Sequence, residues 1–193
     1  MFDVKNDVLS EESRQKPVEK QTMFCVVSIP KFVILFLCIG SPYILYWFYR
    51  NWTAYRNATK ADILPGWRAF FSLFFIFSLF AKIQSRLEAQ GHTYQWFPNA
   101  CAVGIWVVNL LLIGLSRLSF HDISAENFLL LNHLFFAIGI WLFVGAQRAI
   151  NLAEGDAEGK SNAEFTPENC LWMCAGLGVT VFLAVSLLNP TGY

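Results

Sequence analysis

Five long apolar stretches, separated by short polar segments, cover residues 32–49, 64–83, 97–115, 128–146 and 167–188. A helix that crosses a membrane needs about 20 mostly apolar residues, because each residue adds about 1.5 Å against a hydrocarbon core about 30 Å thick. No alternation of apolar and polar residues runs long enough to indicate a barrel, so the backbone must satisfy its hydrogen bonds within helices. The pattern predicts an all-α, polytopic transmembrane bundle with four or five membrane-embedded segments.

The polar segments predict the domain organisation. Residues 1–23 are polar and mixed in charge, without the cleavage site of a secretory signal, and we expect them to form a flexible tail. Residues 24–193 then form a single transmembrane helical domain. Ser124 and Thr166 are predicted N-caps of the fourth and fifth stretches, and Pro167 suits the first helical position of the fifth.

The first stretch, 32–49, is interrupted by Gly40-Ser41-Pro42, which predicts either a kinked helix or a chain reversal. Five spans with a cytoplasmic N-terminus place eight Lys and Arg inside and five outside. A re-entrant first stretch gives nine inside and four outside, with 50–66 in the cytoplasm and 150–165 outside. Because cytoplasmic segments of membrane proteins are enriched in Lys and Arg, the count favours the re-entrant arrangement.

Composition supports the membrane assignment. Apolar residues make up 55% of the chain and charged residues 15%, whereas a water-soluble domain has about 25% charged residues. The net charge is zero, so no overall field attracts nucleic acid. The five Cys show no spaced disulfide framework.

Aromatic and cationic side chains cluster after the break in the first stretch. The predicted interfacial anchors are Tyr46, Trp47, Tyr49, Arg50, Trp52, Arg56, Trp67 and Arg68. Rings at the headgroup level with cations that reach lipid phosphate describe an ordinary aromatic belt, which we prefer. The alternative is recognition of a particular anionic lipid.

The run Gly-Ser-Pro-Tyr-Ile-Leu-Tyr-Trp-Phe-Tyr-Arg-Asn-Trp starting at Gly40, and the run Leu-Pro-Gly-Trp-Arg-Ala-Phe-Phe starting at Leu64, resemble a group of small bacterial inner-membrane proteins. The members of this group are uncharacterised and share an aromatic Tyr-x-x-Tyr-Trp-Phe-Tyr-Arg helix end. The resemblance covers residues 40–83, and it implies a bacterial inner-membrane location but no activity.

Small residues four positions apart predict close contacts between helices. The predicted packing residues are Ala100, Gly104, Gly145, Ala149, Cys170, Cys174 and Gly178. Cys170 and Cys174 also invite a redox or metal interpretation, but no further Cys or His pair has zinc-ligand spacing, so we prefer packing.

Three amide or imidazole side chains lie well inside the apolar stretches: Asn109, Asn132 and His133. They suit hydrogen bonds between helices, and the alternative is a polar path or proton relay. His121 and Asp122 are the one adjacent acid–imidazole pair, and the alternative function they suggest is that of a lipid-headgroup enzyme with His121 as general base.

With no catalytic constellation, cofactor motif or charged path evident, the leading hypothesis is a non-catalytic accessory or structural subunit. We expect it to contact lipid and other membrane-protein subunits, without cofactors or nucleic acid. The alternatives are a small channel or transporter through the three polar residues, and an interfacial enzyme using His121 and Asp122.

Overall fold

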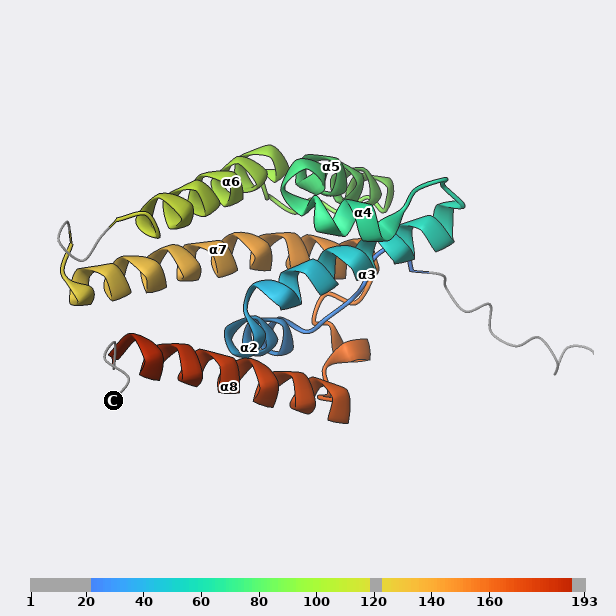
Figure 1. Ribbon diagram of the computed structural model, residues 1–193. Helices are drawn as coiled ribbons and strands as arrows, with labels where there is room; N and C mark the ends of the chain where they lie inside the picture. The colour runs from blue at the N-terminus through green and yellow to red at the C-terminus, as the bar shows by residue number, and fades with distance from the viewer. Residues whose placement is uncertain (1–21, 119–122, 189–193) are drawn as a thin grey trace, which may run out of the picture.

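The computed structural model describes residues 22–118 and 123–188, and the regular structure within these ranges is helical throughout (Figure 1). The elements are α2 (Ile29–Ile39), α3 (Ser41–Thr59), α4 (Pro65–Phe70), α5 (Ser72–Ala89), α6 (Pro98–Leu115), α7 (Ala125–Ala153), the short 3-10 helix η1 (Lys160–Asn162) and α8 (Pro167–Leu188). No strand occurs in this part of the chain, and the prediction of an all-α protein is confirmed. The predicted tail lies outside the described residues, apart from its last two positions.

The first apolar stretch is two helices, α2 and α3, that reverse at Gly40. Gly40 adopts φ 72° and ψ −143°, which residues with a side chain rarely do. Beyond the turn, α3 packs back along α2, with the Phe32 ring 5.6 Å from Tyr43. It continues along the irregular segment before α2, where the Phe24 ring lies 6.1 Å from Tyr55. Of the two structures that the Gly-Ser-Pro break allowed, the chain therefore adopts the reversal.

The second stretch was expected to be one helix over 64–83, but it too is a hairpin, of α4 and α5. Phe71, with φ −93° and ψ 38°, leaves the helical conformation between them. Arg68 of α4 lies over Trp52 of α3, and Lys82 of α5 donates a 2.9 Å hydrogen bond to the Tyr55 hydroxyl. α5 therefore runs in the same direction as α3, and neither Gly nor Pro marks the break.

α6 and α7 form an antiparallel pair. A Cβ on Gly104 would lie 3.0 Å from the Leu142 side chain, and one on Gly139 would lie 3.7 Å from Val108. α7 extends beyond the predicted 128–146 at both ends, whereas α8 has the predicted bounds. Two helices, Pro98–Leu115 and Glu126–Ala153, are long and apolar enough to cross a membrane.

The C-termini of α3, α5 and α7 and the N-termini of α6 and α8 meet at one end of the molecule, on the right in Figure 1. We call it the basic end, because nine of the ten described Lys and Arg lie between the hairpin tips and this end. They are Lys31, Arg50, Arg56, Lys60, Arg68, Lys82, Arg86, Arg148 and Lys160. The tenth, Arg117, follows α6 at the opposite end.

The loop between α7 and α8 is built on side-chain caps. Asp156 accepts hydrogen bonds from the backbone N–H groups of Ser161 (2.8 Å) and Lys160 (2.9 Å), which hold the pKa of its carboxyl below the usual range. Thr166 and Asn169 cap the start of α8 reciprocally, and the Ser124 hydroxyl accepts from Asn127 N at the start of α7. Both N-caps were predicted from the sequence.

Candidate functional site

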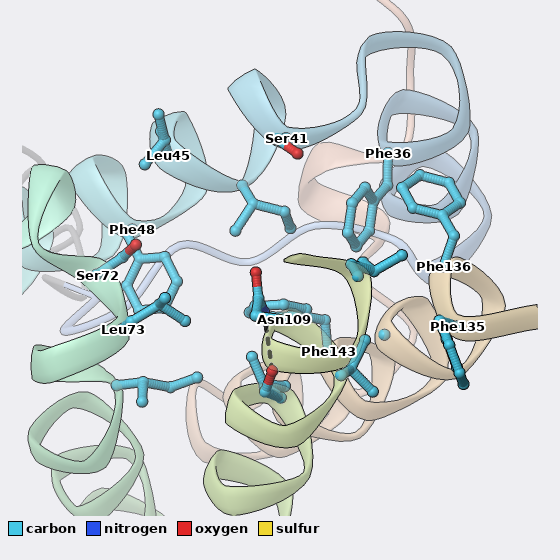
Figure 2. Close-up of a pocket in the computed structure, with 16 residues that line it drawn as sticks. Phe36, Ser41, Leu45, Phe48, Ser72, Leu73, Asn109, Phe135, Phe136 and Phe143 are labelled. Carbon is cyan, nitrogen blue, oxygen red and sulfur yellow. Dashed lines mark hydrogen bonds between the residues drawn. The ribbon is translucent and has the colours of Figure 1, made fainter. Parts of the chain in front are cut away.

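A cavity of about 240 Å³ lies where the two hairpin tips meet α6 and α7 (Figure 2). We call it the tip cavity. Five rings supply much of its wall: Phe36, Phe48, Phe135, Phe136 and Phe143. Its polar side chains are Ser41, Ser72 and Asn109. Ser41 is the first residue of α3 and Ser72 the first of α5, so two helix starts converge here from distant parts of the sequence.

Asn109 is the principal polar group in the tip cavity. Its amide nitrogen donates to the Ile105 carbonyl one turn back on α6, at 2.8 Å, and not to another helix. Its amide oxygen has no protein donor among the described residues. No Lys, Arg, Asp or Glu lines the cavity. The site therefore suits an apolar group, or one that donates a single neutral hydrogen bond, and not an ion.

Asn132 and His133 do not line the tip cavity. Asn132 is half-buried on α7, and His133 is exposed, with its Nδ1 2.7 Å from the carbonyl oxygen of Leu129 on the same helix. The structure does not bring the three predicted polar residues together, and it does not place His133 in the interior. The hydrogen bonds of His133 and of the Asn109 amide nitrogen are to carbonyl groups of their own helices, and neither reaches a second helix.

Replacing His133 by Leu is therefore expected to change the unfolding free energy by less than about 0.5 kcal/mol, as is usual for an exposed substitution. The reason is that no second helix loses a partner. Thermal melting in detergent checks this result. A loss above about 1 kcal/mol would show that His133 bonds across helices, against the geometry.

A buried amide cluster near the basic end holds the irregular segment 22–28 between the helices. Asn151 accepts from Val27 N at 3.3 Å and donates to Val27 O at 2.8 Å. Gln147 donates to Cys25 O at 3.1 Å and to Asn151 Oδ1 at 2.8 Å, and accepts from Trp47 Nε1 at 2.6 Å. Each of these hydrogen bonds pairs a buried polar group. A buried polar group without a partner would lower the stability of the fold.

Two more amides complete this hold on the N-terminal segment. Asn51 of α3 accepts from Cys25 N at 3.0 Å, and Asn162 of η1 donates to Val26 O at 2.9 Å. The buried Lys31 side chain donates to Asn162 Oδ1 and to Glu164 O, both at 2.6 Å. The cluster therefore ties segment 22–28 to α3, to α7 and to the loop before α8. Its role is structural.

The four amides Asn51, Gln147, Asn151 and Asn162 were not predicted from the sequence, because all four lie outside the apolar stretches. The spacing of two of them nevertheless indicated a shared helical face. Gln147 and Asn151 are four residues apart and share a helical face with Ala146 and Ile150, so they lie on a buried side of α7.

The predicted packing residues divide into buried and exposed groups. Gly104 and the fully buried Ala149 lie against neighbouring helices. Ala100 is exposed, and nothing lies within 4 Å of a Cβ built on Gly145.

On α8, Cys170, Cys174 and Gly178 are all exposed, and a Cβ on Gly178 would meet nothing within 4 Å. Contact within the chain runs instead through Gly176. A Cβ there would lie 2.3 Å from the Cys38 carbonyl oxygen. The small-residue strip therefore does not form the packing face between α8 and α2, because it points away from α2.

The predicted interfacial anchors also divide. Tyr46, Tyr49, Arg50, Arg56 and Trp67 are exposed, as interfacial side chains are. Trp47 and Trp52 belong instead to the core. The Trp47 indole N–H donates to Gln147 on α7, and the Trp52 ring lies under the Arg68 guanidinium of α4. The aromatic density of this segment thus serves helix packing as well as the surface.

A charge pair lies inside the basic end. The Glu154 side chain is fully buried, with Oε1 3.5 Å from Arg86 Nε. Neither group has a hydrogen bond within the described residues, so this is a charge contact without hydrogen-bond geometry. It fastens the end of α5 to the end of α7.

Candidate chemistry is sparse in the described residues. No group of three or more His, Cys, Asp or Glu side chains there could hold a metal ion. His121 and Asp122, the candidate catalytic pair, lie outside the described residues. The chain matches no protein-family model, no curated protein and no solved structure.

Proposed function

We propose that this chain is a non-catalytic accessory or structural subunit of a larger assembly in the bacterial inner membrane. In this proposal α6, α7 and α8 cross the bilayer. At about 1.5 Å per residue their 18, 29 and 22 residues give lengths of about 27, 43 and 33 Å, against a core of about 30 Å. The hairpins α2–α3 and α4–α5 enter from the basic end and stop at the middle of α7. The membrane-embedded segments are then five, of which three span.

The charge distribution supports a cytoplasmic basic end. Nine described Lys and Arg lie on that side of the hairpin tips and one lies on the other. Cytoplasmic segments carry such an excess. For the same ten residues, the five-span arrangement inferred from the sequence gives five inside and five outside, and the re-entrant arrangement gives six and four. Both the 60–64 and the 154–166 loops then face the cytoplasm.

The observation that carries the subunit role is the open side of α8. This helix packs against α2 and no other described helix. The strip Cys170, Cys174 and Gly178 lies open on it. Small residues at this spacing let a second helix approach closely, so we assign the strip to a transmembrane helix of a different protein.

The transport alternative has less support. Asn109, Asn132 and His133 are not joined by hydrogen bonds, and the tip cavity carries no ionisable group that could couple transport to an ion.

Native thiols on the strip make the subunit role testable. In membranes from the source bacterium, with the other three Cys replaced, a crosslinker with one maleimide and one photoreactive diazirine should join Cys170 or Cys174 to a second, different protein, whether or not that protein has a Cys. The product should run above the 22.0 kDa chain and be identifiable by mass spectrometry. A matched control moves the thiol to Ala175, which is exposed elsewhere on α8 and should give no product. A homodimer alone, or equal products from both positions, would contradict the proposal.

A further inference from the structure

We propose that Arg68 and the rings around it bind the phosphate of an anionic phospholipid. The inference rests on the membrane embedding proposed above, but not on the subunit role. It assigns a ligand to a cation for which residues 22–118 and 123–188 offer no acceptor.

The Arg68 guanidinium is fixed in place by two rings. Its Cζ lies 4.4 Å from the centroid of Trp52 on α3 and 4.9 Å from that of Phe75 on α5. Both rings attract the cation through their π faces, and neither supplies an oxygen acceptor for the five guanidinium N–H groups. Arg68 is half-buried and has no hydrogen bond or ion pair with any described residue. A planar donor fork held in this way is organised in advance for a two-oxygen acceptor such as phosphate.

Among the described residues, the surroundings of Arg68 carry an unpartnered indole N–H and a second cation. The Trp52 indole N–H is fully buried and lacks a partner in the described part of the chain. The Trp52 ring lies 5.9 Å from that of Tyr55, whose face carries the Lys82 ammonium at 4.6 Å. Over residues 41–89 there are six Lys and Arg and two acids. This part of the molecule therefore attracts an anion.

The neighbouring surface favours a lipid over a soluble anion. Trp67, Phe70 and Phe74 flank Arg68 in sequence on the same hairpin and are 60%, 71% and 68% exposed. Exposed rings make no favourable contact with free phosphate, but they can pack against the acyl chains of a lipid. Placing a charged arginine next to lipid hydrocarbon costs free energy unless an anion pairs with it. In a bilayer the phosphate of a lipid headgroup is such an anion.

The test compares Arg68→Gln with Arg56→Gln in the full chain. Arg56 is an exposed cation on the same pair of hairpins without the two enclosing rings, and so is the matched control. Binding of phosphatidylglycerol to the detergent-solubilised protein is measured by native mass spectrometry, with phosphatidylcholine and inorganic phosphate as comparison probes. Arg68→Gln should weaken phosphatidylglycerol binding by at least about tenfold, the effect of one charge-assisted hydrogen bond. Arg56→Gln should change it less than about twofold.

Three results would overturn the site. They are an equal loss in both variants, unchanged binding in Arg68→Gln, and displacement of the lipid by millimolar inorganic phosphate. If Arg68→Gln fails to fold, Arg68→Lys carries the test: it keeps the charge but loses the fork, and a several-fold loss is expected. Carbonate extraction tests the embedding separately. Release of the chain would contradict the proposed function, whereas retention without lipid selectivity would contradict this site alone.

Discussion

Replacing Asn151 by Leu is expected to lower the free energy of unfolding by about 3–5 kcal/mol. The side chain keeps its volume, but Val27 N–H, Val27 C=O and the Gln147 amide each lose a buried partner. An unsatisfied buried polar group costs about 1–3 kcal/mol, and the segment 22–28 would leave the interior. Thermal melting in detergent measures the loss. Limited trypsin digestion, with faster cleavage after the buried Lys31, measures the release of the segment.

Asn132→Leu is the matched control, because it changes the same residue type on the same helix, at a position whose side chain has no hydrogen bond to any described residue. It should melt within about 0.5 kcal/mol of the parent protein. Equal effects of the two substitutions would mean that the amide cluster does not hold the N-terminal segment.

Replacing Gly176 by Ala is expected to detach α8 from α2, with a loss of at least about 2 kcal/mol. The new Cβ would lie 2.3 Å from Cys38 O and 2.9 Å from Ile39 Cα. Both are backbone atoms of α2 that a side-chain rotation cannot move, so the helices must separate. Melting in detergent and the maleimide labelling rate of the half-buried Cys38 thiol check the result, and both should report a looser α2–α8 contact.

Gly178→Ala is the control for the contact through Gly176. It makes the same chemical change two residues away, where a Cβ meets nothing within 4 Å. Its stability in detergent should match that of the parent. If Gly178→Ala destabilised the isolated chain while Gly176→Ala did not, α8 would pack through the strip of Cys170, Cys174 and Gly178.

Local signals in the sequence predicted much of the helical framework. Short-range interactions between neighbouring residues determine these features. They are the caps at Ser124 and Thr166, the bounds of α8 and the break at Gly40. The break at Phe71 is not one of them, because the run Ala-Phe-Phe-Ser-Leu around it contains neither Gly nor Pro. The contacts that accompany this reversal lie on other helices, at Trp52 and Trp106.

The remaining differences come from long-range contacts. α7 continues past residue 146 because its polar Gln147 and Asn151 bond to segment 22–28 more than 120 residues away. Because Gln147 and Asn151 are polar, the hydropathy pattern predicted that the helix ends at residue 146. Asn109 was identified from the sequence, whereas Ser41 and Ser72 join it only through two chain reversals.

If both hairpins enter from the cytoplasmic side, the chain crosses the membrane three times. Thiol accessibility in intact cells tests this arrangement. Single Cys at Asp62, His92, Ala157 and Leu118, in a background without native Cys, are exposed to an impermeant maleimide. We expect labelling at 118 alone, with 62, 92 and 157 labelled only after the cells are opened. Labelling at 157 from outside, or at 62 from outside, would contradict this arrangement and restore one of the two arrangements inferred from the sequence.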